Sequence, residues 1–187
     1  MPSLFKSTLN TRYLPIKEKK VIRSDCPLQI TPEEIQFLKD NDIKTIIDLR
    51  GSEEYTRMPC FLEKEEGFTY LHLTVTGGNM PKSKEELIPC YLEMVDAQMD
   101  KILDTILNAP SGVMYFCSSG KDRSGMVSLM LLKKLGYDEQ TIIDDYMASK
   151  ENLRPMFDAI RKQYPNFDLS ILIPDEEIIR KVLLALK

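Results

Sequence analysis

The chain has 187 residues, enough for a sizeable core, and we expect one domain over residues 1–187, to which residues 1–20 could form an N-terminal extension. Hydrophobic residues make up 43% and charged residues 29%, as in ordinary globular proteins, and a formal net charge of −4 argues against wholesale nucleic-acid binding. The sequence has neither a signal-peptide apolar stretch nor 18 consecutive apolar residues. We therefore expect a cytoplasmic protein without an integral membrane segment, although a protein delivered out of its producing cell would look the same.

Helix and strand patterns alternate in the first half of the chain. Thr31, with Glu34 three residues later, forms a capping box that predicts a helix over residues 31–40. A short buried strand is predicted over residues 44–50, and a second strand over residues 68–75, ending at Gly77-Gly78.

The middle of the chain predicts a longer helical region. Ser83 and Glu86 form another capping box, and Pro89 is expected to kink or restart the helix. Apolar residues then recur at helical spacing through residues 91–109.

The apolar run over residues 112–116 predicts a buried strand, and residues 124–136 predict a helix that is apolar almost all round. Three further helical segments follow, over residues 138–150, 153–164 and 174–187. Strands that alternate with helices, and that are apolar on both faces, predict an α/β domain with a mostly parallel sheet and a helical C-terminal third.

The segment YFCSSGKDRSG, residues 115–125, lies between the third predicted strand and the buried helix. Ligands of open α/β sheets bind at this position, and a helix N-terminus favours an anion. Small residues at 118–120 would let the backbone curl until its amides converge. The segment therefore predicts a phosphate cradle, whose binding residues would be Ser118, Ser119, Gly120, Lys121, Ser124 and Gly125.

Three charged or nucleophilic residues give this cradle its chemistry. Arg123 offers a planar bidentate donor to phosphate oxygens, and Lys121 would add a point charge at the rim. The field that holds a dianion also stabilises a thiolate, so Cys117 would attack a phosphomonoester and form a phosphocysteine. This chemistry requires no metal and no cofactor. Ser124 is expected to cap the helix, and its hydroxyl could assist the departing thiolate.

The segment resembles the cysteine-dependent phosphatase loop CxxGxxR(S/T), and GKDRSG is similar to the bacterial and fungal tyrosine phosphatase branch whose loop reads HCxxGKDRTG. The stretch RSDCPLQITPEEIQFLKDNDIKTIIDLRGSEE and the stretch LLKKLGYDEQTIIDDYMASKENL are also similar to that branch, so the resemblance covers about residues 20–160. It implies a three-layer α/β/α phosphatase fold and a phosphocysteine mechanism.

The sequence departs from that family at two places. Phe116 stands where the family usually has a histidine that holds the loop and tunes the thiol, which implies a slower enzyme; the only histidine, His72, is expected to be packed or at the surface. The usual aspartate on a separate loop is also missing, because residues 49–95 contain no Asp. Asp122 is the first candidate for the general acid, Asp48 is the second, and the site could also work without one.

Two substrate classes and one non-enzymatic function stay open. An aryl leaving group needs little protonation, which favours phosphotyrosine in a protein and a dual-specificity-like phosphatase. The loop of this chain, CxxGKxR, with Lys121 after the glycine, also resembles the loop of phosphoinositide phosphatases. A phosphoinositide or inositol phosphate is therefore the alternative substrate. The departures at Phe116 and at the general acid would also suit a phosphate-binding pseudophosphatase, although retention of Cys117 argues against it.

Overall fold

The computed structural model describes residues 2–77, 81 and 83–187, and within them five strands form one sheet in the order β1-β2-β5-β3-β4. β1 pairs antiparallel with β2, and all other neighbouring strands are parallel. The strands are β1 (Arg12–Tyr13), β2 (Val21–Ser24), β3 (Ile43–Asp48), β4 (Thr69–His72) and β5 (Gly112–Phe116). The predicted α/β class with a mostly parallel sheet is confirmed.

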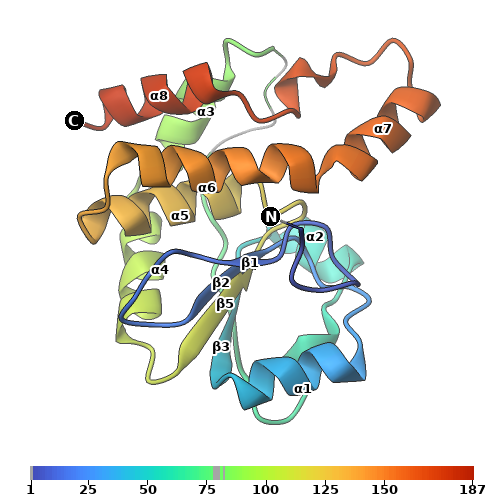
Figure 1. The fold of residues 1–187 in the computed structure, drawn as a ribbon, viewed down its shortest axis with the longest axis vertical. Coiled ribbons are helices and arrows are strands. Elements are labelled where there is room, and N and C mark those ends of the chain that lie inside the picture. The colour runs from blue at the N-terminus through green and yellow to red at the C-terminus, as the bar shows by residue number, and fades with distance from the viewer. Residues whose placement is uncertain (1, 78–80, 82) are drawn as a thin grey trace.

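Helices cover both faces of this sheet (Figure 1). α1 packs on one face. The core on the other face is shared by α3, α4, α5, α6 and α8, where α6 packs on α5, and α8 packs on α6 and α3. The helices are α1 (Pro32–Asp40), α2 (Ser52–Arg57), α3 (Leu87–Glu93), α4 (Ala97–Asn108), α5 (Arg123–Lys134), α6 (Glu139–Asn152), α7 (Arg154–Gln163) and α8 (Glu176–Ala185), with short 3₁₀ turns η1 (Phe61–Glu63) and η2 (Leu169–Ile171). Among the described residues, no helix is long and apolar enough to cross a membrane.

The central strand β5 shows why the sheet needs cover on both sides. Val113 and Tyr115 point into the core shared with α5, whereas Met114 and Phe116 point into the core shared with α1. All four side chains are fully buried. A strand whose successive residues enter opposite cores reads as a continuous apolar run, which is why GVMYF has no polar alternation.

The N-terminal segment belongs to the folded structure. Arg12 and Tyr13 form the edge strand β1, and Phe5 and Leu14 are buried in the two cores. Neither β1 nor β2 was predicted, because two and four residues are too short to show a strand period.

The first helix begins directly after its N-cap Thr31, as predicted. Both hydrogen bonds of the predicted capping box are present. The capping box expected at Ser83 is wrong, since the helix begins only at Leu87. Pro89 therefore lies in the first helical turn, where its missing N–H costs nothing, and it neither kinks nor restarts a helix as we expected.

Two other boundaries differ from the sequence prediction. The helical region 91–109 is divided, because Asp96 accepts a hydrogen bond from the Met99 amide and begins the separate helix α4. The second predicted strand ends at His72 rather than at Gly77-Gly78, and Gly78 lies outside the described residues.

Candidate active site

The predicted phosphate loop follows β5 at the carboxyl edge of the sheet. Ser24 and Asp48 each pair with Phe116, and Asp48 also pairs with His72. The last residues of the four parallel strands therefore lie side by side at one edge of the sheet. Cys117 is the first residue beyond β5, and its side chain is 2% exposed. Six residues later the buried helix α5 begins at Arg123, and its N-terminus faces the loop.

Gly120 lets the loop turn back against β2. Its φ is +66°, and a Cβ built there would lie 2.5 Å from the Ser24 carbonyl and from the Asp25 amide nitrogen. Only glycine fits this conformation and this space. The amides of Ser118 to Asp122 have no hydrogen-bond acceptor among the described residues, so they remain available to an anion.

Arg123 is held by a partner that the sequence analysis missed. Its Nη1 and Nη2 donate to the Glu54 carboxylate at 2.5 Å and 2.9 Å, and the Ser118 hydroxyl donates to the same carboxylate. The hydrogen bonds with Arg123 lower the pKa of Glu54 to about 2. Nε of Arg123 has no acceptor within the described part of the chain, so the Nε edge of the guanidinium remains free for phosphate oxygens.

Glu54 comes from α2, a six-residue helix without buried side chains. The stretch GSEE that contains it follows the DLR end of β3. No local sequence pattern predicts that Glu54 contacts Arg123, because the two residues are 69 positions apart in the chain.

Lys121 does not lie at the rim where we expected it. Its side chain is 3% exposed, and its Nζ donates to the carbonyls of Ile171 and Leu172 at 3.2 Å and 2.8 Å. The ammonium also lies 3.0 Å from the Asp122 carboxylate. Lys121 thus ties the loop to the segment around η2.

Asp122 is the N-cap residue of α5, and its side chain is 36% exposed. Its Oδ1 accepts a hydrogen bond of 2.5 Å from the Tyr91 hydroxyl, which is also 2.9 Å from the Tyr146 hydroxyl. Burial, and then the charge of Asp122, raise the pKa of Tyr91 well above its usual value, so this phenol stays a donor. The carboxylate is therefore oriented by Tyr91 and Lys121 while it remains accessible.

Ser124 and Gly125 lie in the first turn of α5. Ser124 is not the N-cap, because Asp122 has that place; its hydroxyl is fully buried and is the only buried side-chain polar atom without a partner among the described residues. Gly125 faces the core, where an added Cβ would lie 3.2 Å from Nη2 of Arg23. Their first-turn amides have no intrahelical acceptor and still point toward the loop.

Asp48, the second candidate acid, is fully buried beside the loop. Its carboxylate accepts from Nη2 of Arg50 at 2.7 Å and from the Tyr70 hydroxyl at 2.7 Å. The guanidinium of Arg50 lies 5.5 Å from the ring centre of Phe116, which replaces the family histidine. Asp48 is thus a structural ion-pair partner with no exposed atom to offer a substrate.

His72 is also a packed residue. Its Nε2 lies 2.8 Å from the Arg50 carbonyl, and its ring stacks on Tyr55 at 4.2 Å. The other three cysteines are free thiols: Cys60 and Cys90 are buried, and Cys26 is half-buried.

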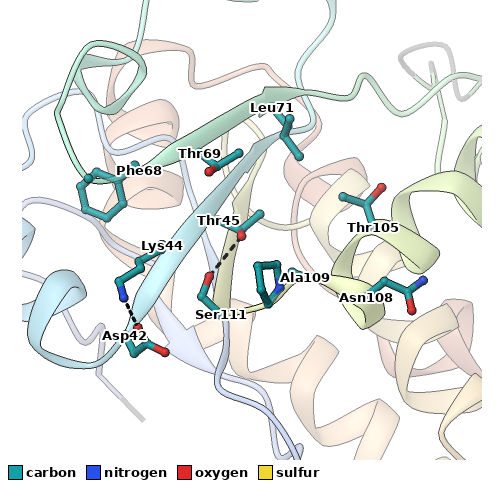
Figure 2. A pocket seen from close by; sticks show the side chains of 12 residues that line it. Asp42, Lys44, Thr45, Phe68, Thr69, Leu71, Thr105, Asn108, Ala109 and Ser111 are labelled. Carbon is teal, nitrogen blue, oxygen red and sulfur yellow. Dashed lines mark hydrogen bonds and ion pairs between the residues drawn. The ribbon is translucent and has the colours of Figure 1, made fainter.

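A large cavity lies at the opposite edge of the sheet (Figure 2). It has a volume of about 850 Å³ and is lined by residues near the amino ends of β3, β4 and β5, among them Thr45, Thr69 and Ser111. Its charged lining residues, Asp42 and Lys44, pair with each other at 2.6 Å. None of the predicted site residues lines it, so the predicted nucleophile Cys117 and the charged residues near it lie at the other edge of the sheet.

Two curated proteins are similar to this chain in sequence. A tyrosine-protein phosphatase of Nostoc commune is 26% identical over 122 residues, which cover 59% of this chain and 42% of that protein. A second relative, from Cupriavidus necator, is 22% identical over 154 residues, covering 73% and 55%. The chain thus spans about half the length of the curated relatives it matches.

Solved structures agree on the fold. The Siw14 catalytic core is 18% identical with a TM-score of 0.52, and the alignment covers 99% of this chain and 93% of that chain. A structure of the PP-IP phosphatase Siw14 from S. cerevisiae in complex with citrate is 19% identical, with a TM-score of 0.50 and coverage of 99% and 94%. The sequence model of the tyrosine phosphatase family matches residues 7–185. The chain therefore belongs to the tyrosine phosphatase family.

Proposed function

We propose that this chain is a single-domain phosphatase that hydrolyses phosphomonoesters, with phosphotyrosine in proteins as its main substrate and Cys117 as its nucleophile. The observation that carries the proposal is that Cys117 is followed by five amides and by the Arg123 Nε, all without an acceptor among the described residues. A phosphoryl dianion needs such a set of unpaired donors beside the nucleophile.

The reaction has two steps. The Cys117 thiolate attacks phosphorus, an S–P bond forms, and the bond from phosphorus to the leaving oxygen breaks. Water then attacks phosphorus, the S–P bond breaks, and inorganic phosphate leaves while the thiolate returns. The amides of residues 118–122 and the Arg123 guanidinium stabilise the equatorial oxygens in both transition states. The unpartnered Ser124 hydroxyl is suited to donate to the thiolate as it departs.

Asp122 is the proposed proton donor to the leaving oxygen, and its carboxylate then takes a proton from the attacking water. Its partial exposure and its two orienting contacts, with Tyr91 and Lys121, support this assignment. The buried ion pair of Asp48 supports a structural role for that residue instead.

The position of Lys121 favours phosphotyrosine over a phosphoinositide. A more highly charged head group would need an extra cation at the rim, whereas this ammonium is committed to Ile171, Leu172 and Asp122. The position of Lys121 therefore gives no support to the alternative substrate class.

The test is steady-state hydrolysis of para-nitrophenyl phosphate by the wild type, Cys117→Ser and the control Cys90→Ser, with EDTA present and from about pH 5 to 8. We expect turnover in the wild type and the control, and none in Cys117→Ser. Turnover by Cys117→Ser would refute the mechanism. A wild type that binds phosphate without turnover would instead be a pseudophosphatase.

A panel of a phosphotyrosine peptide, a phosphoserine peptide and a phosphoinositide then tests the substrate class. We expect the highest kcat/KM with the phosphotyrosine peptide. A preference for the phosphoinositide would overturn that assignment while leaving the phosphocysteine mechanism in place.

A further inference from the structure

Arg23 is a fully buried cation whose guanidinium lies directly behind the phosphate loop. It stands on β2, opposite Tyr115 of β5, and is the first residue of the stretch RSDCPLQITPEEIQFLKDNDIKTIIDLRGSEE that resembles the family. Its Nε donates to the Gly120 carbonyl and its Nη2 to the Lys121 carbonyl, each at 3.0 Å. One planar group therefore holds two successive peptide groups of the loop.

The neighbouring carbonyls of the loop are held from the same side. Nδ2 of Asn10 donates to the Ser119 carbonyl at 3.2 Å and to the Gly120 carbonyl at 3.1 Å. The Cys26 amide donates to the Ser118 carbonyl at 3.1 Å. All four carbonyls of residues 118–121 thus face away from the cradle.

The direction of these carbonyls decides the direction of the amides. In a trans peptide the C=O and the N–H of the following residue point to opposite sides of the chain. Carbonyls of residues 118–121 that are held outward therefore turn the amides of residues 119–122 inward. If one of these peptide groups rotated, its carbonyl oxygen would face the bound anion in place of the N–H group.

An ion-pair network fixes Arg23 in turn. The Asp145 carboxylate on α6 pairs with Nη1 of Arg23 and, at 2.9 Å, with Nε of Arg12. Burial, and then the charge of Arg23, lower the pKa of Arg12 to about 10, so Arg12 stays protonated near neutral pH. Two cations around one carboxylate leave a net positive charge behind the loop, which favours a bound dianion.

We propose that Arg23, with Asn10 beside it, is a positioning residue that presets the inward amides of the phosphate loop for the phosphoryl group. The inference rests on the proposed function only for its kinetic readout, since phosphate binding tests it separately. Arg23 touches no substrate atom; it acts through the peptide groups of Gly120 and Lys121.

The experiment compares Arg23→Lys with Leu103→Ala. Lysine keeps the positive charge but has one donor atom, which cannot reach two carbonyls and the Asp145 carboxylate together. Leu103→Ala removes a fully buried apolar side chain of α4, so it costs folding stability and leaves Asn10, both ion pairs and the loop hydrogen bonds in place. For each protein we would measure Tm, kcat and KM for para-nitrophenyl phosphate, and the Kd for inorganic phosphate and for vanadate.

We expect Arg23→Lys to lower kcat by about 100-fold, in the range found when one transition-state donor is lost, and to weaken vanadate binding more than phosphate binding. Leu103→Ala should lower Tm by a similar amount or more while kcat falls less than about threefold. Equal losses of kcat in the two variants, or a wild-type kcat in Arg23→Lys, would overturn the proposal.

The proposal can still be tested if Arg23→Lys does not fold or if the wild type does not hydrolyse phosphate esters. If Arg23→Lys does not fold, Asn10→Ala leaves both ion pairs in place and should lower kcat and phosphate affinity by about tenfold; wild-type values would overturn the proposal. If the wild type binds phosphate without hydrolysing it, the proposed function fails, and the Kd values for phosphate still decide whether Arg23 positions the loop.

Discussion

Replacement of Glu54 by glutamine tests how the phosphate loop holds its arginine. Lowering the pKa of Glu54 from 4.5 to about 2 corresponds to about 3.4 kcal/mol at about 1.36 kcal/mol per pKa unit. The Glu54 side chain is 34% exposed, so solvent screening reduces the interaction to about 1–2 kcal/mol. If this interaction orients Arg123 for the transition state, kcat/KM should fall by about 5- to 30-fold in Glu54→Gln.

The assay is kcat/KM for para-nitrophenyl phosphate together with the inhibition constant of vanadate. Glu53→Gln is the matched control, because Glu53 lies on the same short helix and is exposed. It should leave both values unchanged. A Glu54→Gln protein that binds vanadate more tightly would refute the reasoning, since it would mean that the carboxylate competes with phosphate for Arg123.

Acid unfolding gives a second measurement of the same contact. Because folding lowers the pKa of Glu54, its contribution to stability is fully present above about pH 4.5 and is lost as the pH falls toward 2. The stability difference between the wild type and Glu54→Gln should therefore be about 1–2 kcal/mol near neutral pH and shrink below about pH 4.5. A difference that does not change with pH would show that Glu54 contributes by packing rather than by charge.

Three other variants test separate parts of the site. Asp122→Asn should cost at least about tenfold more kcat with an alkyl phosphate than with an aryl phosphate, whereas an equal loss would indicate a structural role. Asp48→Asn should destabilise the fold by about 3–5 kcal/mol, measured by urea unfolding, because it leaves Arg50 buried without its counter-charge. A loss of kcat confined to alkyl phosphates would instead indicate that Asp48 is the general acid. Gly120→Ala should cost about 3 kcal/mol and lower Tm by about 6–12 °C, and an unchanged Tm would mean that the turn at Gly120 is not strained by a Cβ.

Where the sequence prediction succeeded, the information was local. The capping box at Thr31 and the apolar run of β5 each depend on residues within a few positions of one another. The loop 117–123 joins a strand to a helix, so its place at the carboxyl edge of the sheet also follows from neighbouring segments. The boundary at Asp96 was missed because an apolar helical period continues on both sides of it.

The sequence by itself determined the α/β class, the family resemblance and the place of the loop that begins at Cys117, because these depend on spacing along a continuous segment. Only the tertiary structure decided which distant side chains serve that cradle: Glu54 on Arg123, Arg23 and Asn10 on the loop carbonyls, and Lys121 on η2. These partners lie 50 to 110 residues from the loop residues they contact. Parallel strand pairing brings the segments to one edge of the sheet, and no local pattern in the chain specifies which side chains will meet there.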